Sequence, residues 1–437
     1  MNIMKKLLPL IVLIVLAYNA FSQQKIQKAP LNEDFVEYMN DNFEKDDVRN
    51  GLVPAPFQVK FDNFYKTGQR KELSAIPNAY DLRDSNRVTS VKNQGNYGTC
   101  WTFSAMASIE SRWLTLEGEK YDLSEKNLAT CNGYLNGINE GGNSYMASAY
   151  MTRLDGPVSE SDDPYYSLTD TSSCVSSYTP VDYATEVRFL RNDINEVKRA
   201  IMNEGAVATS MYFERFSNTE YYNPDTYSWY YSGDKPSNHG VTIVGWDDNK
   251  VISGIPGSPD TEGAWIIKNS WGFSSGDNGY FYMAYEDSRV LNSNSIYPVK
   301  KQKEEIDSLY MYDKLGMVSS YGFQNDTAYA LVKYEATTNE HITQIGSFIN
   351  SYGTEVYIEV YDDFDAESQT LTNLLDSVYN KNIMYPGYHT FDFNADVSDD
   401  FYVKVKYITP NNNYPIPVEV AYSGYSDPVI QPVGFNW

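Results

Sequence analysis

The chain has few cysteines, few histidines and few basic residues. Its 437 residues include 3 cysteines and 3 histidines, and 34 basic against 58 acidic residues give a formal net charge of −24. A chain this acidic repels phosphate backbones, which argues against nucleic acid as a partner. On a folded protein, such charge is more often a solubility feature than a site.

Signals for metals and cofactors are also missing. His341 and His389 lack metal-ligand spacing, and we expect both to be structural or exposed. The acidic runs 247–248 and 362–365 lack an EF-hand pattern and are typical of solvated turns. No zinc, nucleotide or haem motif is present, so we expect no metal site and no cofactor.

Long apolar runs are absent apart from one, which extends from Leu7 to Ala17. Eleven residues are too few to span a bilayer. Lys5 and Lys6 precede the run, and Ala20-Phe21-Ser22 follows it, which fits signal-peptidase cleavage before Gln23. We therefore expect residues 1–22 to be a cleaved export signal. The mature protein is expected to be secreted or otherwise outside the cytoplasm, in the periplasm or at the cell surface, without a membrane span.

The three cysteines are Cys100, Cys131 and Cys174. An odd number in an exported chain predicts one disulfide and one free thiol. The count alone does not say which two pair.

What the chain does contain is ample core material, because 42% of its residues are hydrophobic and 39 are tyrosines. Its length suits two domains plus end segments. Residues 23–75 are polar and charged, with one weak amphipathic helix at 35–43. This composition is typical of a leader that packs on another part of the protein instead of forming its own core.

The pattern of apolar and polar residues changes at Ile76. Apolar residues at spacings of three and four predict a buried helix at 100–117, and a second helix is predicted at 192–204. Short β-rich runs follow at 206–212, 241–246, 264–268 and 280–285. Helices first and strands later predict an α+β domain in two halves.

A charged segment, "VKKQKEEID" at 299–307, reads as a linker. Beyond it the pattern is almost purely β, with runs at 344–349, 355–361, 387–393 and 401–407 between turn residues. Regularly spaced short strands of this kind predict a β-sandwich or jelly roll.

One cysteine lies where a nucleophile would be activated. Gly95 and Gly98 form a loop that delivers Cys100 to the first turn of the buried helix. A helix N-terminus stabilises a thiolate, and the thiolate is the attacking species. A lone cysteine there is more often an inert packed thiol, so the prediction depends on its partners.

Two partners for that cysteine stand beside predicted strands. His239 lies 139 positions after Cys100 and precedes an apolar strand. Asn269 directly follows the strand 265–268, where its amide oxygen can accept the imidazole N–H and orient the ring. Together the three favour nucleophilic catalysis over three separate structural roles.

These segments resemble a known family. "NQGNYGTCWTFS", "NHGVTIVGW" and "KNSWG" followed by "NGYFYM" resemble the signature blocks of the papain family of cysteine peptidases, in the family's order. "IPNAYDLRD" resembles the start of that family's catalytic domain and "IYPV" its end. The resemblance implies a two-lobed catalytic domain at 76–299, with a helical lobe and a β-barrel-like lobe, then a linker at 300–308 and a β domain at 309–437.

The resemblance implies catalytic roles. Cys100 would be the nucleophile and His239 its partner, largely as a thiolate–imidazolium pair. Asn269 would orient His239, and Trp271 would shield that hydrogen bond from water. The side-chain amide of Gln94 would join the Cys100 backbone N–H in binding the developing oxyanion.

The resemblance also implies a substrate site. Gly141 and Gly142 match paired glycines whose backbone binds extended peptides, as in β-augmentation. Asn238 stands where the family often has aspartate, which affects pH dependence without abolishing activity. Asn143 and Asn294, with Ser144, would make the specificity pocket polar.

Departures from the family pattern concern cysteines and the leader. Tyr97 replaces a usual cysteine, and the partner of that cysteine is missing from the run 138–142. Cys131 and Cys174 match a second family disulfide. The leader lacks the family's usual helical propeptide motif, so the resemblance does not predict self-inhibition by residues 23–75.

The last part of the chain resembles the lectin-like β-sandwich that follows some exported microbial papain-like peptidases. The residues that carry the resemblance are "ITQIGSFINS", "TEVYIEVYDD" and "FYVKVKY". The resemblance implies a glycan or cell-surface ligand. The many tyrosines could stack on sugars, but a role in the sandwich core is favoured.

The sequence thus predicts a secreted cysteine peptidase that hydrolyses protein or peptide substrates through a thioester acyl-enzyme. An endopeptidase is favoured because no cleft-blocking insertion is evident. The alternative is a surface adhesin or carbohydrate-binding protein with an inactive papain-like scaffold. A transferase that passes the acyl group to an amine is a third reading.

Overall fold

A computed structural model of the chain describes residues 25–40, 49–59, 75–214, 217–256, 262–336, 338–365, 367–368 and 370–427. The predicted export signal at 1–22 lies outside the described residues. Within them, no helix combines the length and the apolar character needed to cross a membrane.

Five α-helices and two short 3-10 turns are present in the described part of the chain. They are α2 (Glu33–Met39), α3 (Cys100–Glu117), α4 (Glu125–Cys131), α5 (Ser144–Thr152), α6 (Ile194–Glu204), η1 (Tyr165–Ser167) and η2 (Lys303–Glu305). The helices predicted at 100–117 and 192–204 are confirmed. Helix α3 ends at Gly118, whose left-handed φ of 75° suits glycine.

Two helices, α4 and α5, were not expected from periodicity. Nearly every residue of α5 is buried, so it has no polar face and therefore no helical pattern of polar and apolar residues. Their start signals are nevertheless in the sequence. The side chain of Ser124 accepts the N–H of Asn127, and the side chain of Asn143 caps α5 in the same way.

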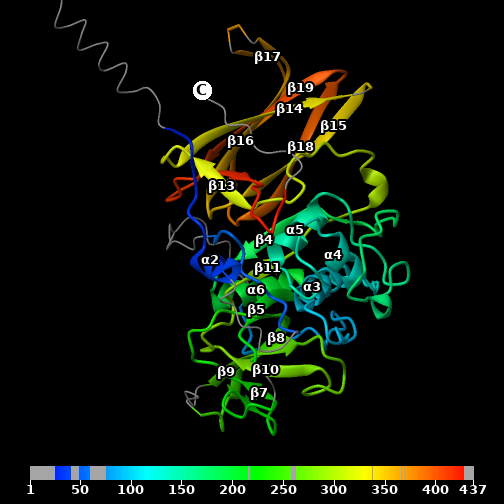
Figure 1. Cartoon of the computed structure of the whole chain (residues 1–437), viewed down its shortest axis with the longest axis vertical. Coiled ribbons are helices and arrows are strands. Elements are labelled where there is room, and N and C mark those ends of the chain that lie inside the picture. Colours follow the sequence, from blue (N-terminus) through cyan, green and yellow to red (C-terminus); the bar gives the residue numbers. More distant parts are fainter. Residues whose placement is uncertain are drawn as a thin grey trace, which may run out of the picture.

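The second lobe of the catalytic region is a sheet. Its strands are β2 (Ala79–Asp81), β4 (Val187–Leu190), β5 (Val207–Met211), β6 (Tyr222–Asn223), β7 (Ser228–Trp229), β8 (His239–Val251), β9 (Glu262–Lys268), β10 (Tyr280–Ala284) and β11 (Asn294–Ile296). The spatial order is β4-β11-β5-β8-β9-β10-β7-β6, with β2 against β8. Figure 1 shows this green lobe beside the cyan helices α3, α4 and α5. The predicted two-lobed α+β fold is confirmed.

The C-terminal region is the predicted β-sandwich. Its strands are β13 (Ser319–Gly322), β14 (Thr327–Glu335), β15 (Glu340–Ile349), β16 (Thr354–Asp365), β17 (Thr370–Ile383), β18 (Gly387–Val397), β19 (Asp400–Ile408) and β20 (Ile416–Val418). The sheet β14-β19-β16-β17 packs on β15 and β18 through a continuous apolar cluster that includes Ile358, Phe393 and Val405. Burial alternates along β16, as expected for a strand with one face in a core.

The two regions share a sheet. Strand β18 pairs with β4 of the catalytic region, at Gly387 with Arg188 and Tyr388 with Val187. The sandwich strands β15 and β18 therefore extend the catalytic sheet past its edge. The regions cannot turn independently without breaking these backbone hydrogen bonds.

The segment predicted as a linker is also held in place. Strand β12 (Lys300–Lys301) pairs with β3 (Tyr183–Ala184). The ammonium of Lys300 lies 2.7 Å from Glu117 and 2.8 Å from Asp182. The charge of Lys300 therefore pairs with carboxylates of the catalytic region instead of being fully solvated. The exact domain limits stay a prediction.

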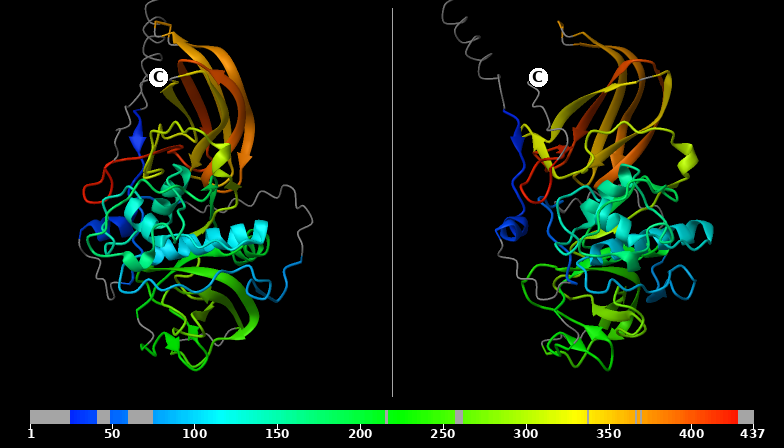
Figure 2. Two further views of the ribbon diagram at one scale, coloured as in Figure 1. Left: turned by 90° about the vertical axis from the view of Figure 1, so that its right-hand side faces the viewer. Right: turned by 45° about the vertical axis from the view of Figure 1, so that its right-hand side comes forward.

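The leader lies along both regions. Strand β1 (Gln27–Lys28) pairs with β13 of the sandwich, and α2 follows it. Phe35 and the later leader residues Val53, Phe57 and Val59 are buried in one apolar cluster with α3 and α5. Figure 2 shows the blue leader beside the red C-terminal segment in both views. The buried apolar residues in the described part of the leader thus pack on other parts of the protein, as predicted from its composition.

The three cysteines form one disulfide and leave one free thiol. Cys131 and Cys174 form a disulfide across a sequence separation of 43, and Cys100 is free and buried. The pairing implied by the family resemblance is confirmed.

We predict that replacing both disulfide cysteines (Cys131→Ser with Cys174→Ser) lowers the free energy of unfolding by up to about 4 kcal/mol, from the restored loop entropy of the unfolded chain. Urea denaturation of the variant and of the oxidised wild type measures this difference. Reduced wild type is the matched control and should resemble the variant. Equal midpoints for the oxidised protein and the variant would show that the bridge does not constrain folding.

Candidate active site

Cys100 is the first residue of α3, as predicted, and its side chain is fully buried. The backbone N–H of Gly240 points at its sulfur, with 3.2 Å between N and Sγ. Backbone N–H groups of Cys100 and Trp101 at the helix start also face the sulfur. These donors and the helix dipole favour the thiolate.

Burial acts on the thiol in the opposite direction. Loss of water around the sulfur raises the pKa of Cys100 to about 11, although N–H groups from Gly240, Gly51 and Trp101 lower it in part. Burial is the larger effect. Gly51 belongs to the leader, so in this form the leader covers the sulfur and the neutral thiol is favoured.

His239 and Asn269 come from neighbouring strands. His239 is the first residue of β8, and Asn269 directly follows β9, which pairs with β8. The His239 Nε2 and Asn269 Oδ1 atoms are 2.9 Å apart. The ring of Trp271 stacks on the imidazole, with 4.6 Å between centroids. The Gly240 contact places Cys100 beside the residue that follows His239.

Gln94 has a fixed orientation beside them. Its Oε1 accepts hydrogen bonds from the Ser270 hydroxyl at 2.6 Å and the Trp271 indole N–H at 3.0 Å. Its Nε2 must therefore point the other way, where it donates to the carbonyl oxygens of Arg49 at 3.0 Å and Tyr97 at 2.8 Å. Arg49 belongs to the leader. Gln94 thus presents an N–H donor to a backbone carbonyl next to Cys100.

The leader pairs with Gly142, one of the two glycines predicted to bind peptides. The Gly142 N–H donates to the Gly51 carbonyl at 2.9 Å, and the Val53 N–H donates to the Gly142 carbonyl at 3.0 Å. On the opposite side, the Leu52 N–H donates to the Asn238 carbonyl at 3.0 Å. These bonds make a parallel β-bridge between Leu52 and Gly142. An extended segment therefore fills the predicted substrate site.

Close backbone approach explains the glycines here. A Cβ on Gly51 would lie 1.9 Å from the Gly98 carbonyl oxygen, and one on Gly141 would lie 2.3 Å from the Gly51 oxygen. A Cβ on Gly142 would meet the Trp101 ring at 2.4 Å. Because glycine has no Cβ, the leader backbone can pass between the Gly98 and Gly141 backbones and reach the Cys100 sulfur.

Three asparagines predicted to bind substrate have other uses for their side chains. Asn143 is buried; its oxygen caps α5 and its amide donates to the Tyr425 hydroxyl at 3.0 Å. Asn294 is buried and bonded to Thr209 and to two backbone carbonyls. The side-chain oxygen and nitrogen of Asn238 both hydrogen-bond to the backbone of Phe213. Only the backbone carbonyl of Asn238 therefore bonds to the leader. Capping and packing thus use the polar atoms of Asn143 and Asn294, and the polar specificity pocket stays a prediction.

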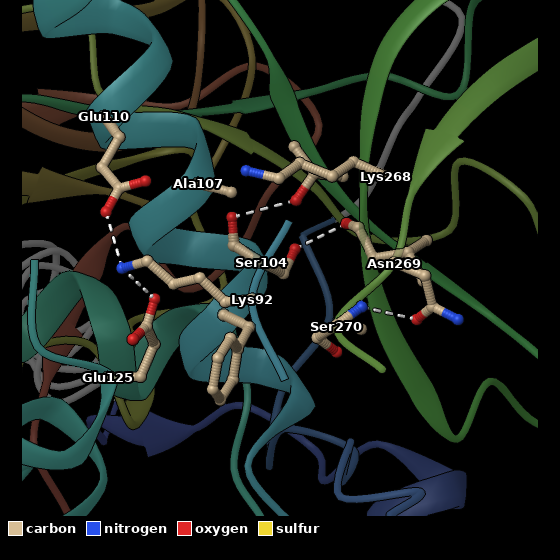
Figure 3. A pocket seen from close by; sticks show the side chains of 12 residues that line it. Lys92, Ser104, Ala107, Glu110, Glu125, Lys268, Asn269 and Ser270 are labelled. Carbon is tan, nitrogen blue, oxygen red and sulfur yellow. Dashed lines mark hydrogen bonds and ion pairs between the residues drawn. The ribbon is translucent and has the colours of Figure 1, made fainter. Parts of the chain in front are cut away.

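A buried charge network lies behind Asn269, and sequence reasoning missed it. Lys92 Nζ contacts Glu110 at 2.8 Å, Asp122 at 2.8 Å and Glu125 at 2.9 Å. Figure 3 shows Lys92 between Glu110 and Glu125, with Lys268 and Asn269 on the facing strand. The signal in the sequence was a lysine, Lys268, at the end of an apolar strand.

Thr89 connects this network to Lys268. The Lys268 ammonium donates to the Thr89 hydroxyl at 3.1 Å, which donates to Glu110 at 2.5 Å. Burial lowers the pKa of Lys268 to about 8. Burial also raises the pKa of Glu125 to about 8, although Lys92 opposes the rise. The network joins the helical lobe to the strand that carries Asn269.

The cavity beside this network is small. It has a volume of about 20 Å³ and is lined by the network and by the backbone around Val241. Substrate pockets typically have volumes of a few hundred Å³. The cavity is therefore a gap at the seam between the lobes and not a substrate site.

The other two histidines lie in the sandwich, away from this site. His341 pairs with Asp396 at 2.8 Å on the surface. His389 is buried, contacts the Tyr385 carbonyl at 2.8 Å and lies 3.2 Å from Glu186 of the catalytic region. Its place at the junction between the two regions fits the structural role expected from the sequence.

We predict that Lys92→Met lowers the free energy of unfolding by about 3–5 kcal/mol, because it leaves buried carboxylates without their cation. The matched control is Lys301→Met. Lys301 is 3.6 Å from the half-exposed Glu305, and such a surface pair contributes at most about 1 kcal/mol. Urea unfolding compares the two variants. Similar small losses in both would contradict a structural role for the network.

Comparisons with known proteins agree with this fold. The papain family cysteine protease profile matches residues 76–299, and a lectin-like domain profile matches residues 309–432. A cathepsin L-like peptidase of Aedes aegypti is 30% identical over 260 residues, covering 58% of this chain and 70% of that protein. Cathepsin S of Mus musculus is 32% identical over 219 residues, covering 48% of this chain and 59% of that protein.

A solved structure covers both regions. It contains the cysteine protease and lectin-like domains of Cwp84, a surface layer associated protein of Clostridium difficile. Its TM-score is 0.75 at 24% identity, covering 92% of this chain and 90% of that one, so it supports the fold. The family profile spans half of this chain and includes Cys100, His239 and Asn269. The chain therefore belongs to the papain family of cysteine proteases, and it is a cysteine peptidase followed by a lectin-like domain.

Proposed function

We propose that the chain hydrolyses peptide bonds through Cys100, His239 and Asn269. The observation that carries the proposal is the hydrogen bond between His239 and Asn269 beside a cysteine at a helix start. With Nε2 of His239 bonded to Asn269, proton transfer with Cys100 would take place at Nδ1. A nucleophile, a base and an orienting amide are the parts needed for acyl transfer.

In the first half of the reaction, the Cys100 sulfur attacks the scissile carbonyl carbon, with its proton held by His239. The carbonyl oxygen becomes an oxyanion, which accepts hydrogen bonds from Gln94 Nε2 and the Cys100 N–H. His239 then gives its proton to the leaving amine as the C–N bond breaks, and a thioester remains. In the second half, His239 takes a proton from water, which attacks the thioester. The acid product leaves and the Cys100 thiol is restored.

We further propose that the form with the leader in place is latent. The Arg49 carbonyl occupies the Gln94 donor, Gly51 contacts the sulfur, and Cys100 is fully buried. A solved relative is described as Cwp84 "after propeptide cleavage", which names such a step for that protein. Activation of this chain would then require removal of the leader from the cleft, despite the absence of the family's usual propeptide motif.

The path of the leader supports endopeptidase action. The segment runs from Arg49, whose guanidinium lies over the Trp271 ring, to Phe57, whose ring contacts Tyr145. Cys100 lies between these points, at Gly51. A cleft that accepts a continuous chain on both sides of the sulfur can bind the interior of a polypeptide.

For the lectin-like domain we propose ligand binding, with a glycan or cell-surface molecule as the partner class. The family profile supports this assignment. The export signal predicted at 1–22 would place such a protein outside the cytoplasm. The adhesin alternative shares this placement but gives no role to the paired His239 and Asn269.

We predict that the leader-free wild type cleaves a peptide library at internal bonds, whereas Cys100→Ala cleaves none. Gln94→Glu keeps the acceptor for Ser270 and Trp271 but loses the amide donor, so kcat should fall roughly 10²- to 10³-fold. Mass spectrometry of the products measures both. Acyl transfer to an added amine in place of hydrolysis would indicate the transferase reading. An inert wild type would favour the adhesin.

We predict that Cys100 in the full-length chain reacts more slowly with iodoacetamide at pH 7.5 than the same thiol after leader removal, because the leader buries the sulfur. Gly51→Ala should speed alkylation of the full chain roughly tenfold, which corresponds to a loss of about 1.4 kcal/mol of leader binding. Initial rates from intact-mass spectra, taken before any processing, check this. Equal rates before and after leader removal would refute latency.

A further inference from the structure

The leader contacts the rest of the molecule in two separate parts. Residues 49–59 fill the cleft, as described above. Residues 25–40, which we call the anchor, lie mainly against the C-terminal domain. Eight residues of sequence separate the two parts.

The anchor begins as an added strand. Gln27 and Lys28 pair with Gly322 and Tyr321 of β13 in antiparallel register. The Ala29 N–H donates to the Ser320 carbonyl at 2.8 Å, which continues the ladder. Backbone pairing of this kind holds an extended segment on a sheet edge with little dependence on its side chains.

Side chains then fix the anchor in place. Phe35 is only 1% exposed and sits among aromatic rings of the C-terminal segment. Its ring centroid is 4.9 Å from Tyr425 and 5.6 Å from Tyr422, both in edge-to-face geometry. The Lys28 ammonium lies 4.8 Å from the Tyr422 ring. A deeply buried aromatic side chain is the usual energetic centre of an interface.

The same aromatic pocket supports the wall of the cleft. The Tyr425 hydroxyl accepts the Asn143 amide at 3.0 Å, and its carbonyl accepts the Leu135 N–H at 3.0 Å. Asn143 directly follows Gly142, which pairs with the leader in the cleft. Asn136 donates to both the Gly141 carbonyl and the Tyr38 hydroxyl of the anchor, each at 3.2 Å. The loop 134–143 therefore contacts both parts of the leader.

We propose that the C-terminal domain is the docking platform that keeps the leader in the active-site cleft. The pocket of Tyr422 and Tyr425 that receives Phe35 is its centre, and β13 extends it. This inference rests on the latency proposed above, and it adds that latency depends on a domain outside the peptidase fold. The leader belongs to the same chain as the cleft, so its binding there is already intramolecular. A second contact at the anchor holds the cleft segment closer to its site and so raises its effective concentration there.

Hydrogen exchange on the full chain tests this, in a Cys100→Ala background that prevents self-processing. The test pair is Phe35→Ala and Val36→Ala, because Val36 is the next residue of α2 and 39% exposed. The readout is exchange at the amides of Leu52, Val53 and Gly142, which are all bonded across the cleft. Phe35→Ala should speed their exchange roughly ten- to a hundredfold, and Val36→Ala should not.

Tyr422→Ala, on the platform side, should give the same result as Phe35→Ala. Loss of protection at Ile243 in β8 would show that Phe35→Ala alters the fold. In that case the result for Tyr422→Ala alone tests the docking proposal. Unchanged exchange at Leu52 and Val53 in Tyr422→Ala and in a folded Phe35→Ala would overturn the proposal, because the cleft segment would then hold by itself. No step of this test needs catalysis. A failure of peptide hydrolysis is therefore separate from a failure of docking.

Discussion

The contact between the start of α3 and the start of β8 is the constraint on which the site depends. A Cβ on Gly240 would lie 3.1 Å from the Trp101 Cα, so a larger residue would push these two backbones apart. The approach brings the Gly240 N–H to the Cys100 sulfur and places His239 next to it. The Ser104 hydroxyl continues the contact by donating to the Val241 carbonyl at 2.6 Å. Cys100 and His239 thus come from different lobes, which are joined at this contact.

Holding two lobes together at a polar seam has an electrostatic cost. Burying charges is unfavourable unless they are paired and hydrogen-bonded. Here the buried carboxylates of Glu110 and Glu125 around Lys92, together with Thr89 and Lys268, form a connected set between α3, α4 and β9. The set lies directly behind Asn269, so it supports the strand end that orients the imidazole. Pairing and hydrogen bonding within the set offset part of this cost.

The C-terminal region is more closely integrated than a tethered binding module. It shares a sheet with the catalytic region through β4 and β18, and the segment expected to be a linker pairs with β3. One apolar cluster includes leader residues, α3, α5 and side chains such as Phe348 and Tyr425 from the sandwich. Leader, peptidase and sandwich therefore form a single packed unit. Removal of the leader would expose apolar surface on both of the other parts.

What the sequence by itself determined were the features with local signals. Helical spacing predicted α3, short β-rich runs between turn residues predicted the sandwich strands, and the motifs led to the proposal of Cys100, His239 and Asn269 as site residues. The pairing of Cys131 with Cys174 also followed, through the family resemblance. Boundaries differed by a few residues, as at β8, which extends from His239 to Val251 beyond the predicted 241–246. Short buried helices such as α5 were missed because a fully buried helix has no amphipathic pattern.

Only the tertiary structure decided the features that depend on residues far apart in the sequence. The side chains of Asn143 and Asn294 hydrogen-bond to Tyr425 and Thr209, partners that only the folded chain brings near. The leader carried no recognisable inhibitory motif. Its position in the cleft comes from a glycine, Gly51, that fits between Gly98 and Gly141, and from Phe35 in a pocket almost 400 positions away. Such fits depend on the shapes of the cleft and the pocket. Residues far apart in the sequence form these shapes, so no local pattern of residues predicts them.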